Sequence, residues 1–140
     1  MNLLEIEKLI NDQSKESQFV LRAHLIVEYL LEEIIQYTIK RSDILLDNNF
    51  NFPQKVSIAY STGALEEKIA TSLKNLNKVR NKFSHELHYK ISEKDVDSIG
   101  IPLGDIYKKE KENNFELLEK ATYSLIGYMY GIVFNLKDKK

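Results

Sequence analysis

The sequence predicts an all-α fold, a bundle of four or five principal helices with short accessory helices. Only five glycines and two prolines occur among 140 residues, so long stretches lack the residues that break helices. Within those stretches, apolar residues recur at spacings of three and four, which is the helical period. No segment alternates apolar and polar residues as a half-exposed strand does. The length suits one core, and we expect a single helical domain over residues 1–140.

The first part of the chain predicts a short helix followed by a long one. Residues 2–11 are rich in leucine and isoleucine, and Ser14 or Ser17 can cap the next helix, which runs to about Lys40. This helix is roughly 40 Å long at 1.5 Å per residue, and its apolar surface is wider than one stripe. We therefore expect it at the centre of the bundle or shared with a second subunit. Its apolar residues are Phe19, Val20, Ala23, Ile26, Val27, Leu30, Leu31, Ile34 and Ile35.

The remainder of the chain predicts a loop over residues 42–52 and then further helices. Pro53 suits the first turn of a helix, because the N–H that proline lacks has no partner there. Ser92, three residues before Asp95, resembles a capping box that opens a short helix. Residues 100–104 contain two glycines and a proline and interrupt the chain. The expected helices cover about residues 53–61, 64–83, a short stretch after Ser92, and 114–136.

The composition excludes several classes of chemistry. The formal net charge is −1, so any contact with nucleic acid has to come from a local basic patch. The chain has no cysteine, which excludes disulfides, thiol nucleophiles and cysteine-ligated metals. No apolar run approaches the length of a membrane span, and the first residues do not have the form of a signal peptide. We expect a cytoplasmic protein that contacts no membrane and uses no metal or cofactor.

Residues 76–85, near the end of the helix expected over 64–83, combine the side chains that phosphate chemistry needs. Arg80, Asn81 and His85 fall within six residues of one another. Arginine is a permanent cation with a planar set of donors that suits phosphate, and histidine exchanges a proton near neutral pH. Residues 74–90 carry a net charge of +4, so the rest of the chain carries −5.

Helical geometry sets a condition on this pair of residues. Five positions on an ideal helix separate Arg80 from His85 by about 140° around the axis. The two side chains can reach one phosphate only if the helix loosens near residues 83–84 or if two subunits meet there. The alternative is structural: Arg80 forms an ion pair, His85 ends a helix, and the lysines are a solvated face.

These residues also resemble a known family. Arg80 and Asn81, followed by His85 after a basic amphipathic helix, resemble the Arg-x4–6-His motif of HEPN domains, which are all-α. A polar residue directly after the arginine belongs to that pattern. Upstream, residues 22–35 and 52–60 together with Gly63 are similar to parts of the mannitol operon repressor family, which shares the fold. The resemblance covers about residues 17–90.

The resemblance implies a metal-independent endoribonuclease from a toxin–antitoxin or phage-defence system. The RNA 2′-hydroxyl attacks the adjacent phosphorus and leaves a 2′,3′-cyclic phosphate. His85 acts as general acid or base, Arg80 stabilises the transition state, and Asn81 orients the histidine or contacts phosphate. The family implies a homodimer with the motif at or near the interface, and an antitoxin or regulatory protein as a further partner. Lys74, Lys78 and Lys82 are the expected contacts to the RNA backbone.

Two points qualify the family pattern. Many related toxins carry a tyrosine two positions after the histidine as a modification target, whereas this chain has Leu87 there and Tyr89 two positions further. The mannitol operon repressor family implies a second possible function, a non-catalytic regulator that acts through protein partners. Of the two remaining histidines, we expect His24 to pack in the core or lie at the surface, and we expect His88 to bind no metal.

Overall fold

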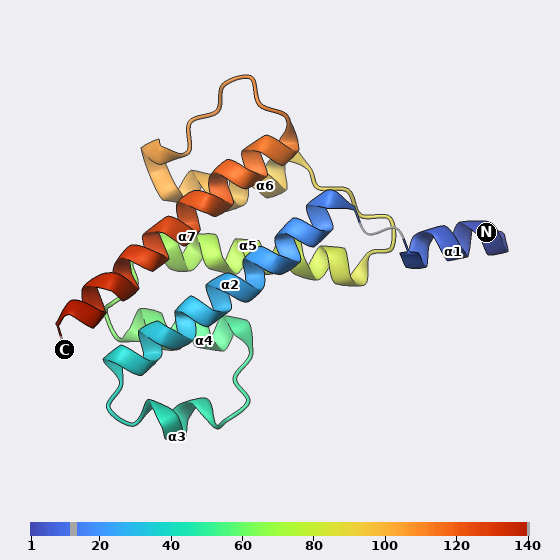
Figure 1. Cartoon of the computed structure of the whole chain (residues 1–140). Helices are drawn as coiled ribbons and strands as arrows, with labels where there is room; N and C mark the ends of the chain where they lie inside the picture. The colour runs from blue at the N-terminus through green and yellow to red at the C-terminus, as the bar shows by residue number, and fades with distance from the viewer. Residues whose placement is uncertain (12–13, 140) are drawn as a thin grey trace.

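The computed structural model describes residues 1–11 and 14–139, and these residues form helices and no strand. The predicted all-α fold is therefore confirmed. The elements are α1 (Leu3–Asn11), α2 (Lys15–Thr38), α3 (Ser42–Leu46), α4 (Phe52–Ser61), α5 (Glu67–His85), α6 (Glu93–Gly100), the 3₁₀ helix η1 (Ile101–Ile106) and α7 (Asn114–Asp138) (Figure 1).

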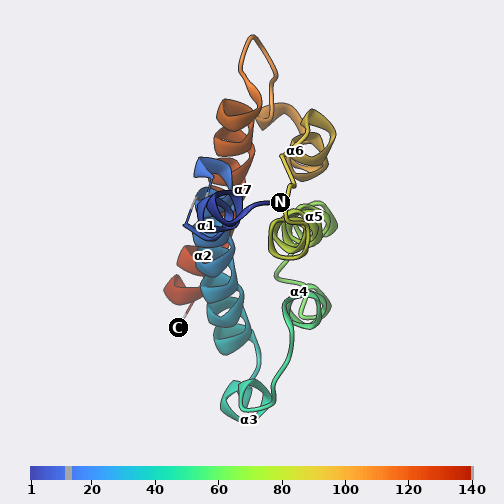
Figure 2. The ribbon, with the colours of Figure 1, turned by 90° about the vertical axis from the view of Figure 1, so that its right-hand side faces the viewer.

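The helices of the bundle are arranged in two layers. α2 and α7 lie side by side in one layer, and α4, α5 and α6 form the layer that faces them (Figure 2). α2 and α7 run in the same direction, because Phe19 packs on Phe115 near their N-terminal ends and Glu33 pairs with Lys137 near their C-terminal ends. The short helix α3 connects the two layers at one end of the molecule (Figure 2).

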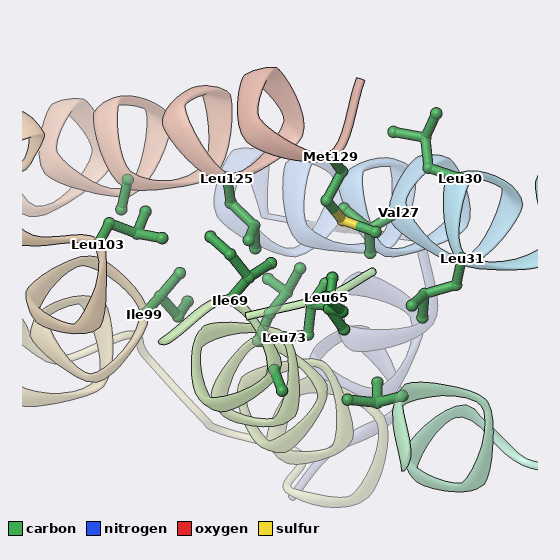
Figure 3. Packing of buried hydrophobic residues seen from close by; sticks show 14 of the residues in the cluster. Val27, Leu30, Leu31, Leu65, Ile69, Leu73, Ile99, Leu103, Leu125 and Met129 are labelled. Carbon is green, nitrogen blue, oxygen red and sulfur yellow. The ribbon is translucent and has the colours of Figure 1, made fainter. Parts of the chain in front are cut away.

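One apolar core fills the space between the layers. Leu31 of α2, Leu73 of α5, and Leu125 and Met129 of α7 are completely buried there (Figure 3). The apolar stripe of α5 is thus held against α2 and α7. This packing fixes the rotation of α5 about its axis and turns the residues beside the stripe, Arg80 among them, toward the edges of the core.

The first helix lies outside this core. α1 has no buried residue, and Figure 1 shows it projecting from the rest of the molecule. Its apolar side chains are exposed to solvent in the single chain, with Leu3 at 71% and Leu4 at 76% of full exposure. An amphipathic helix without a packing partner in its own chain is a notable feature of this molecule.

The helix starts are fixed by side-chain caps. Ser14, not Ser17, caps α2, and its hydroxyl accepts a hydrogen bond of 3.0 Å from the Ser17 backbone N–H. Asn51 and Gln54 form a reciprocal capping box at the start of α4, which the sequence analysis did not anticipate. Pro53 lies in the first turn of that helix, as predicted. Ser92 caps α6 by accepting from the Asp95 N–H, also as predicted.

Several predicted boundaries were wrong. The expected loop over residues 42–52 contains α3, where Leu45 and Leu46 pack against the core. α5 begins at Glu67 instead of residue 64, because the chain turns at Gly63 with φ of 83° and then continues non-helically through Glu66. Residues 100–104, expected only to interrupt the chain, end α6 and begin η1.

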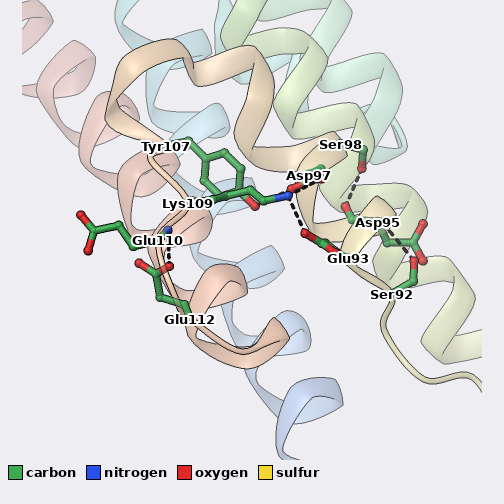
Figure 4. Close-up of polar contacts among 9 residues, drawn as sticks. All are labelled: Ser92, Glu93, Asp95, Asp97, Ser98, Tyr107, Lys109, Glu110 and Glu112. Carbon is green, nitrogen blue, oxygen red and sulfur yellow. Dashed lines mark hydrogen bonds and ion pairs between the residues drawn. The ribbon is translucent and has the colours of Figure 1, made fainter.

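A polar network holds the segment after η1 against α6. Lys109 pairs with Glu93 at 2.6 Å and with Asp97 at 3.0 Å. The Tyr107 hydroxyl donates to the same Asp97 carboxylate at 2.9 Å (Figure 4). Burial and the adjacent Asp97 carboxylate both raise the pKa of Tyr107, so the phenol stays protonated and remains a donor.

Candidate functional site

Three neighbouring hollows follow the side of the molecule where α2 passes α5. The first has a volume of about 410 Å³ and is bordered by His24, Arg80 and Asn81. The second, of about 210 Å³, shares Arg80 with the first. The third, of about 410 Å³, shares Ser84 with the second and contains His85. Each hollow shares lining residues with the next, and we call this row of three hollows the α2–α5 groove.

Arg80 is half-buried in this groove and has no carboxylate partner. No carboxylate among the described residues lies within ion-pair distance of its guanidinium, whose Nη1 is 3.5 Å from the Asn81 side-chain oxygen. Its Nε is buried and finds no acceptor in the described part of the chain. The structural alternative for this residue, an ion pair, is therefore not realised among the described residues. The guanidinium retains most of its five donors for a ligand.

His24 shares the first hollow with Arg80. Only 7% of this histidine is exposed, its Nε2 lies 2.9 Å from the Asn77 side-chain oxygen, and its ring packs 4.2 Å from the ring of Phe52. Burial lowers the pKa of His24, and the nearby Arg80 charge acts in the same direction. The Asn77 hydrogen bond and Glu28 oppose the shift without cancelling it. The neutral imidazole is therefore favoured near neutral pH.

His24 and Asn77 are site residues that the sequence analysis missed. We expected His24 in the core or at the surface, and it is indeed buried, but no motif connected it with Arg80. The two partners His24 and Asn77 are 53 positions apart, and only the crossing of α2 over α5 brings them together. One signal was present, since Asn77 precedes Arg80 by three residues and so lies on the same side of α5.

His85 lies at the far end of the groove and is exposed. It is the last residue of α5, which stays helical through residues 83–84, and the Glu86 N–H still bonds to the Lys82 carbonyl at 2.9 Å. The helix therefore does not loosen, and Arg80 and His85 point about 140° apart. In a single chain these two side chains border different hollows. The sequence left two ways for Arg80 and His85 to reach one phosphate, a loosened helix or the meeting of two subunits. Only the meeting of two subunits remains.

The three lysines of the basic segment differ in their surroundings. Lys74 and Lys78 are exposed and form no ion pair with the described residues. Lys82 instead pairs with Asp95 of α6 at 2.9 Å. Burial alone raises the pKa of Asp95, but hydrogen bonds from Tyr89, Lys82 and Ser92 outweigh it and lower the pKa overall. Lys82 therefore links α5 to α6, and Lys74 and Lys78 are the more accessible cations.

Two further observations describe the rest of the molecule. Among the described residues, no group of three or more histidine or acidic side chains is arranged to hold a metal ion. None of the described helices combines the length and the apolar character that crossing a bilayer requires.

This chain matches no protein-family model, no curated protein and no solved structure. The residues that border the α2–α5 groove and the resemblance of the motif in α5 are therefore the observations that bear on function.

Proposed function

We propose that this chain is a metal-independent endoribonuclease of the HEPN type and a component of a toxin–antitoxin or phage-defence system. The strongest support is the state of Arg80. Its guanidinium is half-buried in an open groove, lies beside Asn81, and has no carboxylate partner among the described residues. A cation that the fold desolvates without neutralising is suited to bind an anion.

The proposed chemistry is an internal transesterification of RNA. A histidine accepts the proton of the 2′-hydroxyl, whose oxygen attacks the adjacent phosphorus. The bond to the 5′-oxygen breaks, the same histidine returns its proton to that oxygen, and a 2′,3′-cyclic phosphate remains. Arg80 stabilises the charge on the phosphoryl oxygens, and Asn81 orients the site or contacts phosphate. Lys74 and Lys78 attract the RNA backbone that flanks the cleaved phosphate. Lys82 also attracts the RNA backbone, from its position beside Asp95.

We propose that the active form is a homodimer, with each site built from both chains. Because α5 is unbroken, Arg80 of one chain needs the His85 of a second chain to complete the site. His85 borders a hollow that is also lined by the apolar side chains of Leu9, Ile10 and Leu87, and Ile10 and Leu87 are largely exposed in the single chain. Such a surface is suited to be covered by a second copy. Control of this activity in a cytoplasmic toxin requires a further protein partner, an antitoxin.

Cleavage of mixed RNA in the presence of EDTA tests this proposal. The wild-type protein is expected to produce fragments with 2′,3′-cyclic phosphate ends, identified by mass spectrometry. His85→Ala and Arg80→Ala are each expected to reduce the rate at least about a hundredfold. His88→Ala is the matched control, because His88 is exposed and lies outside the motif. Equal cleavage by the wild type and by His85→Ala rules out the proposed role of His85.

Mixing the two inactive variants tests the shared site. In a dimer with composite sites, each mixed pair of Arg80→Ala and His85→Ala chains contains one intact site. An equimolar mixture is therefore expected to recover about a quarter of the wild-type rate if chains exchange freely. No recovery after demonstrated exchange excludes a site that combines Arg80 and His85 of different chains.

A second candidate function is a non-catalytic regulator that resembles the mannitol operon repressor family and acts through protein partners. The unpacked apolar face of α1 favours it, since such a face is suited to a protein partner. Expression in cells discriminates the two functions. Growth inhibition that Arg80→Ala relieves supports the nuclease, whereas absence of both toxicity and RNA cleavage supports the regulator.

A further inference from the structure

The first hollow of the α2–α5 groove has a polar wall formed by residues of α2 and α5 and by the residue that caps α4. Its volume of about 410 Å³ is much larger than a phosphate group and leaves room for an attached sugar or base. Apolar side chains, including Leu25 and Phe52, line the remainder of the hollow. The polar residues that border it are His24, Glu28, Asn51, Asn77, Arg80 and Asn81.

The charged groups at this hollow differ in whether they have a partner. Arg80 contributes a full positive charge with no carboxylate partner in the described part of the chain. Glu28 is the carboxylate at the border of the hollow, but it pairs with Lys55 at 3.3 Å. The Lys55 ammonium also binds Glu32 at 2.7 Å. Lys55 thus offsets part of the charge of Glu28, whereas Arg80 has no carboxylate within ion-pair distance among the described residues and keeps its charge for a ligand.

The hydrogen bond between His24 and Asn77 fixes the rotation of the Asn77 amide, and Asn77 borders the hollow. The Asn77 oxygen lies 2.9 Å from His24 Nε2, so the neutral imidazole donates its proton to that oxygen. The amide nitrogen of Asn77 then points away from His24, and its two hydrogens bond to no described residue. The imidazole is buried and packs against the ring of Phe52, which restrains this orientation. Asn77 thus brings a second unused donor to the hollow that Arg80 also borders.

We propose that this hollow is a phosphate-binding site, in which Arg80 and the Asn77 amide donate to the phosphate oxygens and His24 is the positioning residue that fixes the amide. The inference deepens the proposed function, because an RNA phosphate enters the same groove, but it requires binding alone and no cleavage. Two sources supply the same chemistry: an internal phosphodiester of RNA, or the terminal phosphate of a mononucleotide.

NMR titration of the full chain tests the site. The probes are inorganic phosphate, adenosine 5′-monophosphate, adenosine without phosphate, and a 2′-O-methyl oligoribonucleotide without terminal phosphate, which cannot be cleaved. A phosphate-bearing probe is expected to shift the His24 ring and Asn77 amide resonances, and adenosine is not. Arg80→Gln and Asn77→Asp are each expected to weaken binding at least about tenfold. Arg22→Gln, an exposed cation on α2 outside the hollow, is the matched control.

The positioning role of His24 has its own readout. His24→Gln keeps a donor for the Asn77 oxygen and is expected to retain binding within about threefold, whereas His24→Phe is expected to lose about tenfold. Circular dichroism and the urea midpoint establish that each variant is folded. If His24→Phe does not fold, the Asn77 amide shift in the wild-type chain decides whether that amide is a donor, and its absence overturns the proposal.

The outcomes distinguish this site from the proposed nuclease. Binding of the oligonucleotide alone assigns the internal phosphodiester, and binding of the mononucleotide alone assigns the terminal phosphate. Phosphate binding in a protein that cleaves no RNA supports this site and rejects the nuclease. Unimpaired RNA cleavage by Asn77→Asp supports the nuclease and rejects this phosphate site. Equal shifts with adenosine and its monophosphate, or no response to any probe at millimolar concentration, overturn the phosphate site.

Discussion

At the scale of single residues, Arg80 differs from the other half-buried cations of this molecule in having no counter-charge. Lys55 and Lys82, for example, each bind carboxylates within 3.5 Å. A buried donor without an acceptor costs stability, and a bound ligand is one way in which such a group is satisfied. The state of Arg80 is the observation that supports the proposed function most directly.

This explanation predicts how stability responds to the loss of each cation. Arg80→Met is expected to leave the free energy of unfolding unchanged or slightly higher, because no ion pair is lost and the stem remains apolar. Lys55→Met is the comparison, since it leaves Glu28 and Glu32 without a partner, and we expect a loss of about 1–2 kcal/mol. Urea unfolding at pH 7 measures both. A loss for Arg80→Met as large as that for Lys55→Met indicates a structural role for Arg80.

His24 gives a second prediction at this scale, a dependence of stability on pH. The pKa of His24 is lowered in the folded chain, so below its unfolded value of about 6.5 the unfolded chain binds more protons. The contribution of His24 to stability is therefore complete above about pH 6.5 and decreases as the pH falls below that value. His24→Gln is expected to remove this part of the slope in urea unfolding between pH 7.5 and 5.5. His88→Gln, at an exposed histidine, is expected to keep it.

At the scale of helices and their connections, the close approach of α6 to the segment after η1 requires a glycine. A Cβ built at Gly100 overlaps the ring of Tyr107, whereas one at Gly127 in the middle of α7 meets nothing within 4 Å. The Tyr107 ring covers the end of α6 and is held there by its hydrogen bond to Asp97. In the sequence, Gly100 indicates only a helix break, because its contact with Tyr107 depends on the tertiary structure.

Two glycine-to-alanine substitutions test this contact. Gly100→Ala is expected to lower the free energy of unfolding by about 1–3 kcal/mol, because the methyl group forces the Tyr107 ring out of place. Gly127→Ala is expected to raise it by about 0.5–1 kcal/mol, because alanine restricts the unfolded chain and favours helix. Thermal and urea unfolding measure both variants. Similar effects of the two substitutions contradict the packing of Tyr107 on Gly100.

At the scale of the whole molecule, stability is concentrated in the two-layer core, and α1 contributes little within one chain. Leu73→Ala removes a fully buried side chain from the middle of α5, and we expect it to cost about 2–5 kcal/mol. Leu4→Ala, in α1, is expected to change the free energy of unfolding by less than about 0.5 kcal/mol at a concentration where the protein is monomeric. A large effect of Leu4→Ala in the monomer contradicts the position of α1 outside the core.

The helices and the candidate site differ in how far the sequence could predict them. The long helices α2 and α7 were predicted within a few residues, because an uninterrupted apolar period is a local property of the chain. The start of α5 was placed three residues too early, since Leu65 is buried like the stripe residues although it precedes the helix. α3 was missed because five residues are too few to show a period.

The sequence by itself determined the all-α class, the main helices, and the relation of Arg80, Asn81 and His85 along α5. These features depend on neighbouring residues and on the fixed rotation of a helix. Only the tertiary structure decided that Arg80 has no counter-charge among the described residues, that Lys82 is held by Asp95, and that His24 and Asn77 meet beside the arginine. Contacts between distant residues depend on how helices cross, and an apolar stripe allows several crossings without selecting the polar neighbours that result.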